Sequence, residues 1–277
     1  MSKLSRGLAI GFILLVNFLL STANSADLIF TSPPRESPAT GEIQYGPVAA
    51  YLTKLLKTKV TYKHPGNWLN YQREMRDNKY DIVFDGPHFA SWRMAHIGHD
   101  MIAKLPGSLV FYLVRKKDDS SINSLRDLIG KRICGISMPN LSTLSILSGY
   151  PNPARQPVIV GVKGGMKGVA KALGKNRCNA YVFRDKFFNK AFKPEVRDTL
   201  QIIYTSKPMP NQAISAGQRV TPAQKKAMTH SLTIGNGVDS TQSIRKRFAG
   251  KARSMVKATN EEYQNYNMLL EGVIFGW

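Results

Sequence analysis

Short apolar runs alternate with amphipathic stretches along the chain after residue 26, and this alternation limits the possible folds more than any other feature. The first part predicts, in order, a strand at 28–31, a helix at 47–57, a strand at 59–63, a helix at 68–77 and a strand at 81–85. Strands that alternate with helices favour a largely parallel sheet with helices on its faces. The sequence therefore predicts an α/β fold.

The same alternation starts again near residue 110. It predicts an extended segment at 109–115, a short helix at 122–128 and then strands and helices at 132–136, 142–148, 157–162, 166–173, 180–183, 200–204 and 213–216, with a helical tail from Pro222 onward. We expect two α/β lobes, each a mostly parallel sheet flanked by helices, formed by residues 27–110 plus 210–277 and by residues 111–209. The chain would cross twice between the lobes, near 110–115 and 205–213, which favours a hinge.

The N-terminus has the order of a secretory signal. Lys3 and Arg6 precede an apolar run at 8–20, and small residues follow, including Ala23 and Ala26. A run of this length is shorter than the roughly 17–25 residues of a membrane helix, which disfavours an uncleaved anchor. We expect residues 1–26 to be a signal peptide, cleaved after Ala23 or Ala26, and the mature chain to work in the periplasm.

The charge of the chain is strongly positive, with 39 Lys and Arg against 18 Asp and Glu. A positive field concentrates small oxyanions, anionic headgroups or nucleic acid near a protein. An ordinary solvated surface explains the charge equally well, and a basic polyanion-binding protein is a weaker alternative that predicts salt-sensitive binding to DNA. We expect no nucleic-acid partner and a monomer.

The chain has two cysteines, Cys134 and Cys178, and no Cys-x-x-Cys motif. Zinc ribbons, thioredoxin chemistry and c-type haem are therefore disfavoured. Both cysteines adjoin predicted strands, and an oxidising compartment permits a disulfide between them. Two buried thiols are the alternative.

Candidate ligand-binding residues follow from a rule of open α/β sheets, in which ligands bind beyond the carboxyl ends of the strands. The loops at these positions are rich in hydrogen-bond donors and include Arg35, Asn140 and Gly164. We select the seven residues Tyr45, Asp85, His88, Ser142, Thr143, Arg184 and Asp185.

Each of these residues also has a structural interpretation. Tyr45 stands just before a predicted helix, where it reaches a cleft or packs in the core. Asp85, Ser142 and Thr143 suit a ligand or a helix cap. His88 fits an anion or an aromatic neighbour, and Arg184 and Asp185 form part of a site or pair with each other.

Catalytic motifs are absent from the sequence. It contains no Gly-x-Ser-x-Gly, no His-Glu-x-x-His and no Walker loop. His96 and His99 have helical spacing, but no carboxylate or cysteine pattern completes a metal site, so a solvated helix end is the better interpretation. We expect no enzyme activity, no metal and no cofactor.

Four stretches resemble the family of periplasmic phosphate, phosphite and phosphonate-binding proteins of ABC transporters. They are Tyr45-Gly-Pro-Val-Ala-Ala-Tyr-Leu52, Asp81-Ile-Val-Phe-Asp-Gly-Pro87, Ser124-Leu-Arg-Asp-Leu-Ile-Gly-Lys-Arg132 and Val220-Thr-Pro-Ala-Gln-Lys-Lys226. The resemblance implies a two-lobed type II binding fold that traps a ligand by hinge closure and delivers it to a membrane permease. It also implies an anion site at Ser142, Thr143, Tyr45 and His88.

Two departures from the family pattern concern specificity. The turn is Ser142-Thr-Leu-Ser145 without a following glycine, and the segment after the glycine-rich helix is Cys178-Asn-Ala180 where the family tends to have an aspartate. The leading hypothesis is capture of a small anionic solute, a phosphorus oxyanion, for an ABC transporter. Sensing for a membrane kinase is the alternative, and a thiamine- or pyrimidine-related enzyme on the same scaffold is a weaker one.

Overall fold

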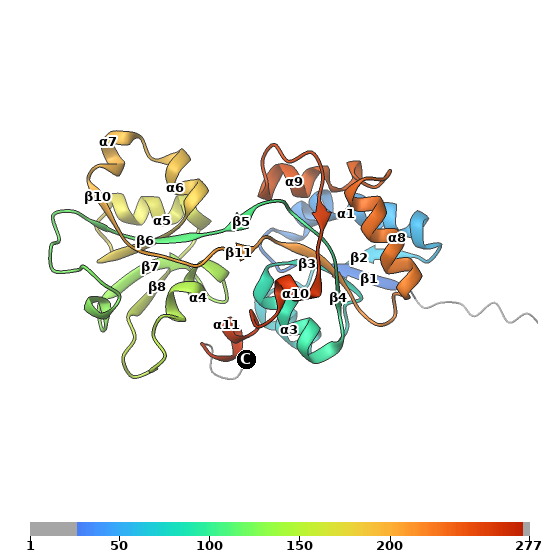
Figure 1. The fold of residues 1–277 in the computed structure, drawn as a ribbon, viewed down its shortest axis with the longest axis horizontal. Coiled ribbons are helices and arrows are strands. Elements are labelled where there is room, and N and C mark those ends of the chain that lie inside the picture. Colours follow the sequence, from blue (N-terminus) through green and yellow to red (C-terminus); the bar gives the residue numbers. More distant parts are fainter. Residues whose placement is uncertain (1–26, 274–277) are drawn as a thin grey trace, which may run out of the picture.

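Two α/β lobes lie side by side in the computed structural model, which describes residues 27–273 (Figure 1). The predicted signal peptide and its cleavage sites at residues 1–26 lie outside the described residues. Within the described residues, no helix is both long enough and apolar enough to cross a membrane.

The first lobe is built on a six-stranded sheet with the order β13-β4-β12-β3-β1-β2. Strands β1, β2 and β3 run parallel to one another, whereas β12 is antiparallel to β3 and β4. All residues of the central strands β3 and β12 are buried, as expected for strands covered on both faces. The strand bounds are β1 Leu28–Thr31, β2 Val60–Tyr62, β3 Ile82–Asp85, β4 Asp100–Lys104, β12 Ala213–Ala216 and β13 Val256–Lys257.

The second lobe is built on a five-stranded sheet with the order β10-β6-β9-β7-β8. Strand β7 is parallel to β8 and β9, and β6 is antiparallel to β9 and β10. The bounds are β6 Phe111–Lys116, β7 Arg132–Ile136, β8 Val158–Val162, β9 Ala180–Arg184 and β10 Leu200–Thr205. Both sheets are thus mixed. Each has a core of parallel strands, and the strands that follow the interlobe crossings, β12 and β6, pair with that core in the antiparallel direction.

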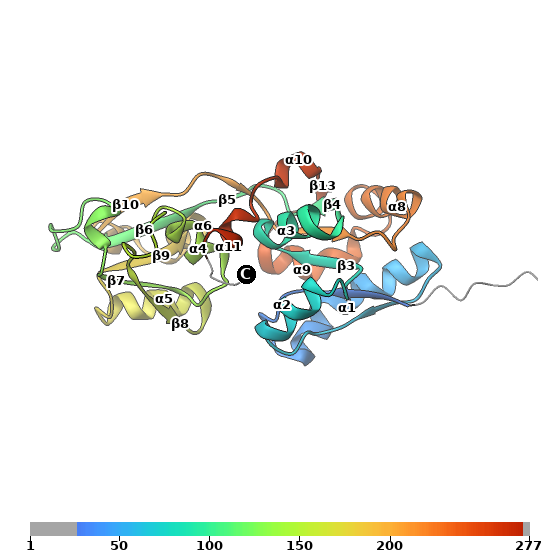
Figure 2. The same cartoon turned by 90° about the horizontal axis from the view of Figure 1, so that it is seen from below.

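The helices cover the sheets on both sides (Figures 1 and 2). In the first lobe they are α1 Pro38–Leu56, α2 Trp68–Arg76, α3 Pro87–Ile97, α8 Pro222–Thr233, η2 Asp239–Thr241, α9 Gln242–Phe248 and α10 Asn260–Tyr263. In the second they are η1 Arg126–Leu128, α4 Leu141–Leu147, α5 Gly165–Gly174, α6 Asp185–Ala191 and α7 Pro194–Arg197. The last helix, α11 Met268–Glu271, lies between the lobes and contacts both α3 and α4.

The first helix begins nine residues earlier than predicted from the sequence, at Pro38 instead of Pro47. The side chain of Ser37 caps it by accepting a hydrogen bond from the backbone N–H of Thr40 at 3.3 Å. Pro47 therefore lies inside the helix, on its exposed side, where water can solvate the carbonyl that loses its N–H partner. As a consequence Tyr45 is a helical residue and not a loop residue.

The sequence interpretation also missed several elements. Strand β4 follows α3 directly after Gly98, which has a φ of +66° and ends that helix. The short helices α6 and α7 and the two-residue strand β13 are too short for periodicity to reveal.

The lobes are connected by two antiparallel segments, β5 Ser108–Leu109 and β11 Met209–Pro210, which pair with each other. The segment from α10 to α11 then returns to the boundary between the lobes. We call residues 265–273, which include α11, the C-terminal strap. Leu269 packs against the core of the second lobe, and Leu270 is buried in a cluster that contains Phe89 of the first lobe and Leu144 of the second.

Candidate functional site

A cavity of about 230 Å³ lies between the lobes and is lined by residues of both. The first lobe contributes residues from the loop after β1, from α2, from the start of α3 and from the end of α9. The second contributes residues from β6, from the turn before α4, from the start of α5 and from the end of β9. The lining residues are Arg35, Trp68, Gly86, His88, Phe89, Leu109, Phe111, Ile136, Pro139, Asn140, Leu141, Met166, Arg184, Gln212 and Phe248.

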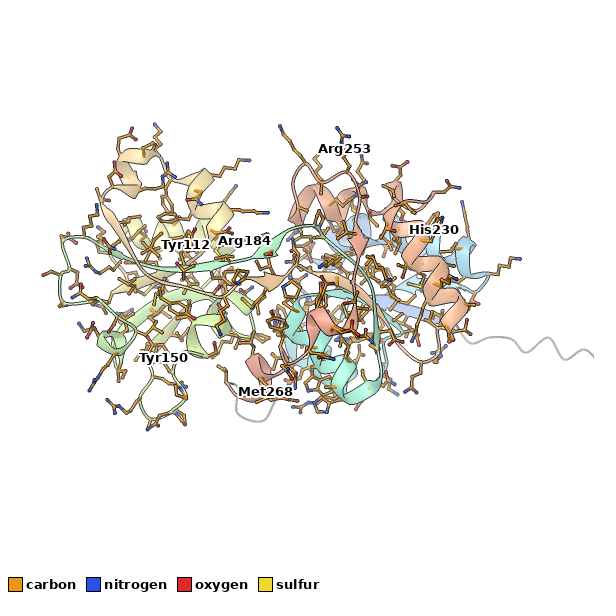
Figure 3. All side chains as sticks on the ribbon, viewed as in Figure 1. Tyr112, Tyr150, Arg184, His230, Arg253 and Met268 are labelled. Carbon is orange, nitrogen blue, oxygen red and sulfur yellow. A yellow bond between two sulfur atoms is a disulfide. The ribbon has the colours of Figure 1, made fainter. Side chains whose placement is uncertain are left out.

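Two arginines face this cavity from opposite lobes. Arg35 follows β1, and its Nη1 is buried without a hydrogen-bond partner. Arg184 ends β9, and its Nε is likewise buried without a partner. Figure 3 shows Arg184 on the side of the second lobe that faces the first. Because buried donors normally have partners, both guanidinium groups are prepared for an acceptor from outside the protein.

Phe248 holds both arginines in place, Arg35 through its ring and Arg184 through its backbone carbonyl. The guanidinium carbon of Arg35 lies 5.6 Å from the ring centre of Phe248, and Nη1 of Arg184 donates to the backbone carbonyl of Phe248 at 3.3 Å. Phe248 thus contacts both arginines and links the lobes. Cation–π contact orients a guanidinium without neutralising it, so the positive charge remains available.

His88, in the first turn of α3, forms a second link between the lobes. Its Nε2 lies 3.1 Å from the backbone carbonyl of Pro139, while its Nδ1 is buried without a partner. Burial lowers the pKa of His88 to about 3, so the ring is neutral near pH 7. Nε2 then carries the proton that Pro139 accepts, which leaves Nδ1 as an acceptor. A Cβ at Gly86 would lie 2.9 Å from Cε1 of His88, so glycine at that position gives the ring its room.

The polar lining contains no carboxylate among the described residues. Its other polar groups are the side chains of Gln212, whose Oε1 is buried without a partner, and Asn140. Glu36, which follows Arg35 in the chain, forms an ion pair with Arg247 at 2.7 Å. The cavity therefore combines two cations with neutral acceptors and an apolar wall.

Asp85 lies at the end of β3, and it does not line the cavity. Its Oδ2 accepts hydrogen bonds from Tyr71 Oη at 2.7 Å and from Arg93 Nη1 at 3.1 Å, and all three side chains are fully buried. Burial raises the pKa of Asp85, and the charge of Arg93 opposes that shift. In this structure Asp85 is part of a buried polar network with Tyr71 and Arg93, which both belong to the first lobe.

Tyr45 is fully buried and does not line the cavity either. Its ring packs against Phe30, Tyr62 and Phe84 with centroid separations of 5.3–6.3 Å. Its hydroxyl donates to Glu36 at 3.4 Å. The structure thus gives Tyr45 the core position that the sequence left open as an alternative.

Ser142 and Thr143 lie in the first turn of α4 with their hydroxyls already bonded. Ser142 Oγ donates to the side chain of Asn140 at 2.7 Å, and Thr143 Oγ1 donates to the carbonyl of Ile136 at 2.6 Å. Asn140 caps the helix by also accepting from the N–H of Ser142. Neither hydroxyl residue lines the cavity, whereas Asn140 does.

Asp185 follows Arg184 directly and begins α6, but it does not line the cavity. Its Oδ1 is buried without a partner. Burial lowers the pKa of Arg184, and the charge of Asp185 opposes that shift. Asp185 therefore affects the cavity only indirectly, through its electrostatic interaction with Arg184.

Of the seven predicted residues, His88 and Arg184 line the cavity. The selection made from the sequence omits Arg35 and Gln212, as well as the aromatic residues Trp68, Phe89 and Phe248. Arg35 follows the first strand, so the strand-end rule does point to it. Gln212 lies on the second crossing, just before β12, and nothing in its sequence context distinguishes it.

His96 and His99 do not form a pair. His96 lies on α3 and contacts Glu271 at 2.5 Å, whereas His99 is buried after the helix, with Nδ1 3.1 Å from Ser215 Oγ. The prediction of a solvated helix end is therefore wrong for His99. Within residues 27–273 no group of His, Cys, Asp and Glu side chains is arranged to hold a metal ion.

The two cysteines are joined in this structure by a disulfide, with a Cα–Cα distance of 5.7 Å. Cys134 lies on β7 and Cys178 just before β9, its parallel neighbour. The disulfide lies in the apolar cluster on one side of this sheet.

Comparison with known proteins identifies a family model for the "ABC transporter, phosphonate, periplasmic substrate-binding protein" that matches residues 30–263. No curated protein sequence matches the chain. Among solved structures, a Xanthomonas citri protein bound to ATP has a TM-score of 0.69 at 14% identity, covering 89% of this chain and 96% of that one.

Two further solved structures share the fold. PhnD1 of Prochlorococcus marinus, in complex with methylphosphonate, has a TM-score of 0.63 at 15% identity, covering 89% of this chain and 98% of that one. A binding protein component of an ABC phosphonate transporter from Pseudomonas aeruginosa has a TM-score of 0.58 at 14% identity, covering 88% and 85%. At these identities the likeness shows the fold alone.

Proposed function

Because this chain belongs to the family of periplasmic substrate-binding proteins of phosphonate ABC transporters, and has the two-lobed type II fold of such proteins, we propose that it captures a small phosphorus oxyanion between its lobes. The bound solute is then delivered to a membrane permease from the periplasm. The lobes that close on the solute are residues 27–110 plus 210–277 and residues 111–209.

One observation carries this proposal. Arg35 and Arg184 reach one cavity from opposite lobes, each with a buried nitrogen that has no partner, and no carboxylate among the described residues lines that cavity. An oxyanion that accepts from both guanidinium groups forms charge-assisted hydrogen bonds to both lobes at once. Such a ligand stabilises the closed arrangement because the open one can supply only one of the two cations.

His88 narrows the choice of oxyanion. Its unpartnered Nδ1 is an acceptor, so the best ligand presents one remaining O–H as well as charged oxygens. A phosphonate, phosphite or phosphate with one acidic proton meets both needs. Sulfate has similar size and shape but carries no proton at neutral pH, so it leaves Nδ1 unsatisfied at a cost of about 1–3 kcal/mol.

The size of the cavity supports a small ligand. Its volume of about 230 Å³ lies below the roughly 300–1,000 Å³ of pockets for drug-sized molecules. The apolar wall formed by Trp68, Phe89 and Leu141 suits a short alkyl substituent on the phosphorus. We therefore expect an alkylphosphonate to bind at least as well as phosphate.

The test is calorimetric titration of the mature protein with methylphosphonate, phosphite, phosphate, sulfate and a set of neutral and cationic metabolites. We expect one phosphorus oxyanion to bind with a Kd at least tenfold lower than that of sulfate. Arg35→Gln and Arg184→Gln should each weaken it by about 10- to 100-fold, since a hydrogen bond to a charged group is worth about 1.5–3 kcal/mol.

Lys79→Gln is the matched control, because Lys79 is exposed in the first lobe and its loss changes the net charge equally. It should leave the Kd within twofold. Melting temperatures without ligand show whether each variant folds. Binding of only a neutral or cationic compound, or a Kd indifferent to both arginine variants, would reject the oxyanion.

A further inference from the structure

One long stretch of the second lobe carries positive charge with no acidic residue among it. Residues 128–184 contain no Asp or Glu, and their nine basic residues are Lys131, Arg132, Arg155, Lys163, Lys167, Lys171, Lys175, Arg177 and Arg184. Of these, Arg184 serves the cavity described above. The ligand site therefore leaves most of this acid-free charge unexplained.

Four of these residues recur at every fourth position along α5 and its flanks. Lys163 precedes the helix, Lys167 and Lys171 lie in it, and Lys175 is its C-cap residue. We call these four residues the lysine row. All four are exposed, and the helix turns Val169, Ala172 and Leu173 toward the core. Residues four apart lie on the same helix face, so Lys167 and Lys171 share one face, and Lys163 and Lys175 flank the two ends of the helix.

Glycines shape the turn that joins Lys163 to the helix. Gly164 and Gly165 have φ values of +85° and +62°, which favour glycine and turn the chain sharply after β8. At Gly168 a Cβ would lie 1.9 Å from the carbonyl oxygen of Lys163, so only glycine permits this close approach. Together with Arg177, three lysines of the row surround a surface hollow of about 400 Å³ that has no acidic lining residue.

This arrangement opposes the stability of the helix itself. Like charges four residues apart destabilise a helix by a few tenths of a kcal/mol per pair. Lys167 lies in the first turn, where the helix dipole favours acidic residues, and that turn contains none. None of the four lysines forms an ion pair within residues 27–273. The row is thus a local cost to the fold with no partner inside the described structure.

We propose that the lysine row and Arg177 are a docking surface for the anionic headgroups of a lipid bilayer. Lysines near an anionic bilayer each contribute about 1 kcal/mol through diffuse electrostatic attraction, without a specific fit. A protein partner is less suited, because protein interfaces are depleted in lysine and depend on buried Trp, Tyr and Arg, and no Trp or Tyr lines this hollow. The same lack of aromatic rings disfavours single-stranded nucleic acid, whose bases stack on such rings.

The position of the surface suits a binding protein that works at a membrane. Figure 2 shows α5 and β8 along the outer margin of the second lobe. Met166, one residue before Lys167, lines the interlobe cavity, so the row begins beside the ligand site and extends away from it. A lobe held to the bilayer in this way keeps the mouth of the cavity close to the plane of the membrane.

The test is flotation of the mature protein with vesicles of phosphatidylcholine alone and with vesicles in which about one-third to one-half of the lipid is phosphatidylglycerol. We expect binding to the anionic vesicles only, and loss of binding when salt is raised severalfold, because salt screens exposed charges. The quadruple variant with Gln at each position of the row should lose about fivefold in partition coefficient per lysine, on the order of several hundredfold in all.

A matched quadruple variant removes four exposed lysines of the first lobe that form no ion pair there, namely Lys54, Lys79, Lys226 and Lys251. It has the same net charge as the row variant and should keep most of the binding. Equal loss in both variants would show that net charge alone is responsible and would overturn the proposal. So would binding to heparin or to an acidic protein with no binding to anionic vesicles. Melting temperatures no lower than that of the unmodified protein show that both variants remain folded.

Discussion

At the scale of single residues, the sequence indicates where polar side chains gather but not which of their atoms remain unpartnered. The strand-end rule selects Ser142 and Thr143, whose hydroxyls are bonded within the protein, and Asp85, whose Oδ2 is bonded to Tyr71 while its Oδ1 is buried without a partner. It equally indicates the loop of Arg35, whose guanidinium group has a buried nitrogen without a partner. The direction of each side chain and its local hydrogen bonds decide between such candidates, and no periodic pattern in the sequence reports either of them.

Two buried histidines make stability depend on pH. Burial lowers the pKa of both His88 and His99 to about 3, and for His99 the charges of Arg93 and Lys225 act in the same direction. The unfolded chain takes up these protons below about pH 6.5, whereas the folded chain does so only near pH 3. The unfolded state binds more protons in that window, so the free energy of unfolding falls as pH decreases, by about 1.4 kcal/mol per pH unit for each histidine.

The slope is measured by urea unfolding between about pH 6 and pH 4. His99→Asn should remove the contribution of one proton and flatten the slope by about 1.4 kcal/mol per pH unit. His230→Gln, at an exposed position on α8, is the control and should leave the slope unchanged. A slope that stays the same in His99→Asn would contradict the assignment.

At the scale of elements, periodicity identifies the strands and long helices because each buries a regular set of apolar residues. Strands β1, β7 and β10 begin where the sequence predicts. The start of α1 shows the limit, since Pro47 looks like a first-turn proline and the true cap is Ser37, ten residues earlier. A proline inside a helix costs about 3 kcal/mol or more, and here the cap and the buried face outweigh that cost and decide the boundary.

The disulfide fastens two neighbouring elements of the second lobe, β7 and the turn before β9. It closes a separation of 44 residues, for which restriction of the unfolded chain contributes about 4 kcal/mol at most, and 2–4 kcal/mol is typical. We expect reductant to lower the free energy of unfolding by about that amount. Chemical denaturation with and without reductant measures it.

Variants of the cysteines give the matched comparison. Cys178→Ala and the double variant Cys134→Ala with Cys178→Ala both lack the bond, so both should lose similar stability and neither should respond to reductant. If the reductant lowered the free energy of unfolding of the unmodified protein by more than the cysteine variants lose, the effect of the reductant would not come from this disulfide alone.

At the scale of the whole molecule, the two-lobed plan follows from the two series of strands and helices, and the mixed sheets follow from the crossings between them. The sequence interpretation assigns residues 210–277 to the first lobe, and the C-terminal strap departs from this simple division because Leu269 packs on the second lobe core. A four-residue helix such as α11 is too short for a sequence pattern to predict such a contact. Figure 3 places Met268 of this helix at the boundary between the lobes.

The strap should hold the closed arrangement. Leu270 is fully buried among residues of both lobes, so Leu270→Ala should lower the free energy of unfolding by about 2–5 kcal/mol. It should also enlarge the radius of gyration of the ligand-free protein in small-angle X-ray scattering. Leu69→Ala is the control, because Leu69 is 74% exposed and its change should stay within about 0.5 kcal/mol. An unchanged radius in Leu270→Ala would mean that the strap does not govern closure.

The pairing of β5 with β11 has a consequence for the timing of ligand exchange. Two connections bonded side by side bend together, while the strap beside them has to leave an apolar surface before the lobes can part. The solute can enter while the two lobes are already apart. Its release requires the strap to leave its apolar surface and the lobes to separate each time. The lifetime of the loaded protein is therefore set by its own chain as well as by the ligand, and a partner that displaces the strap would act as a trigger for release.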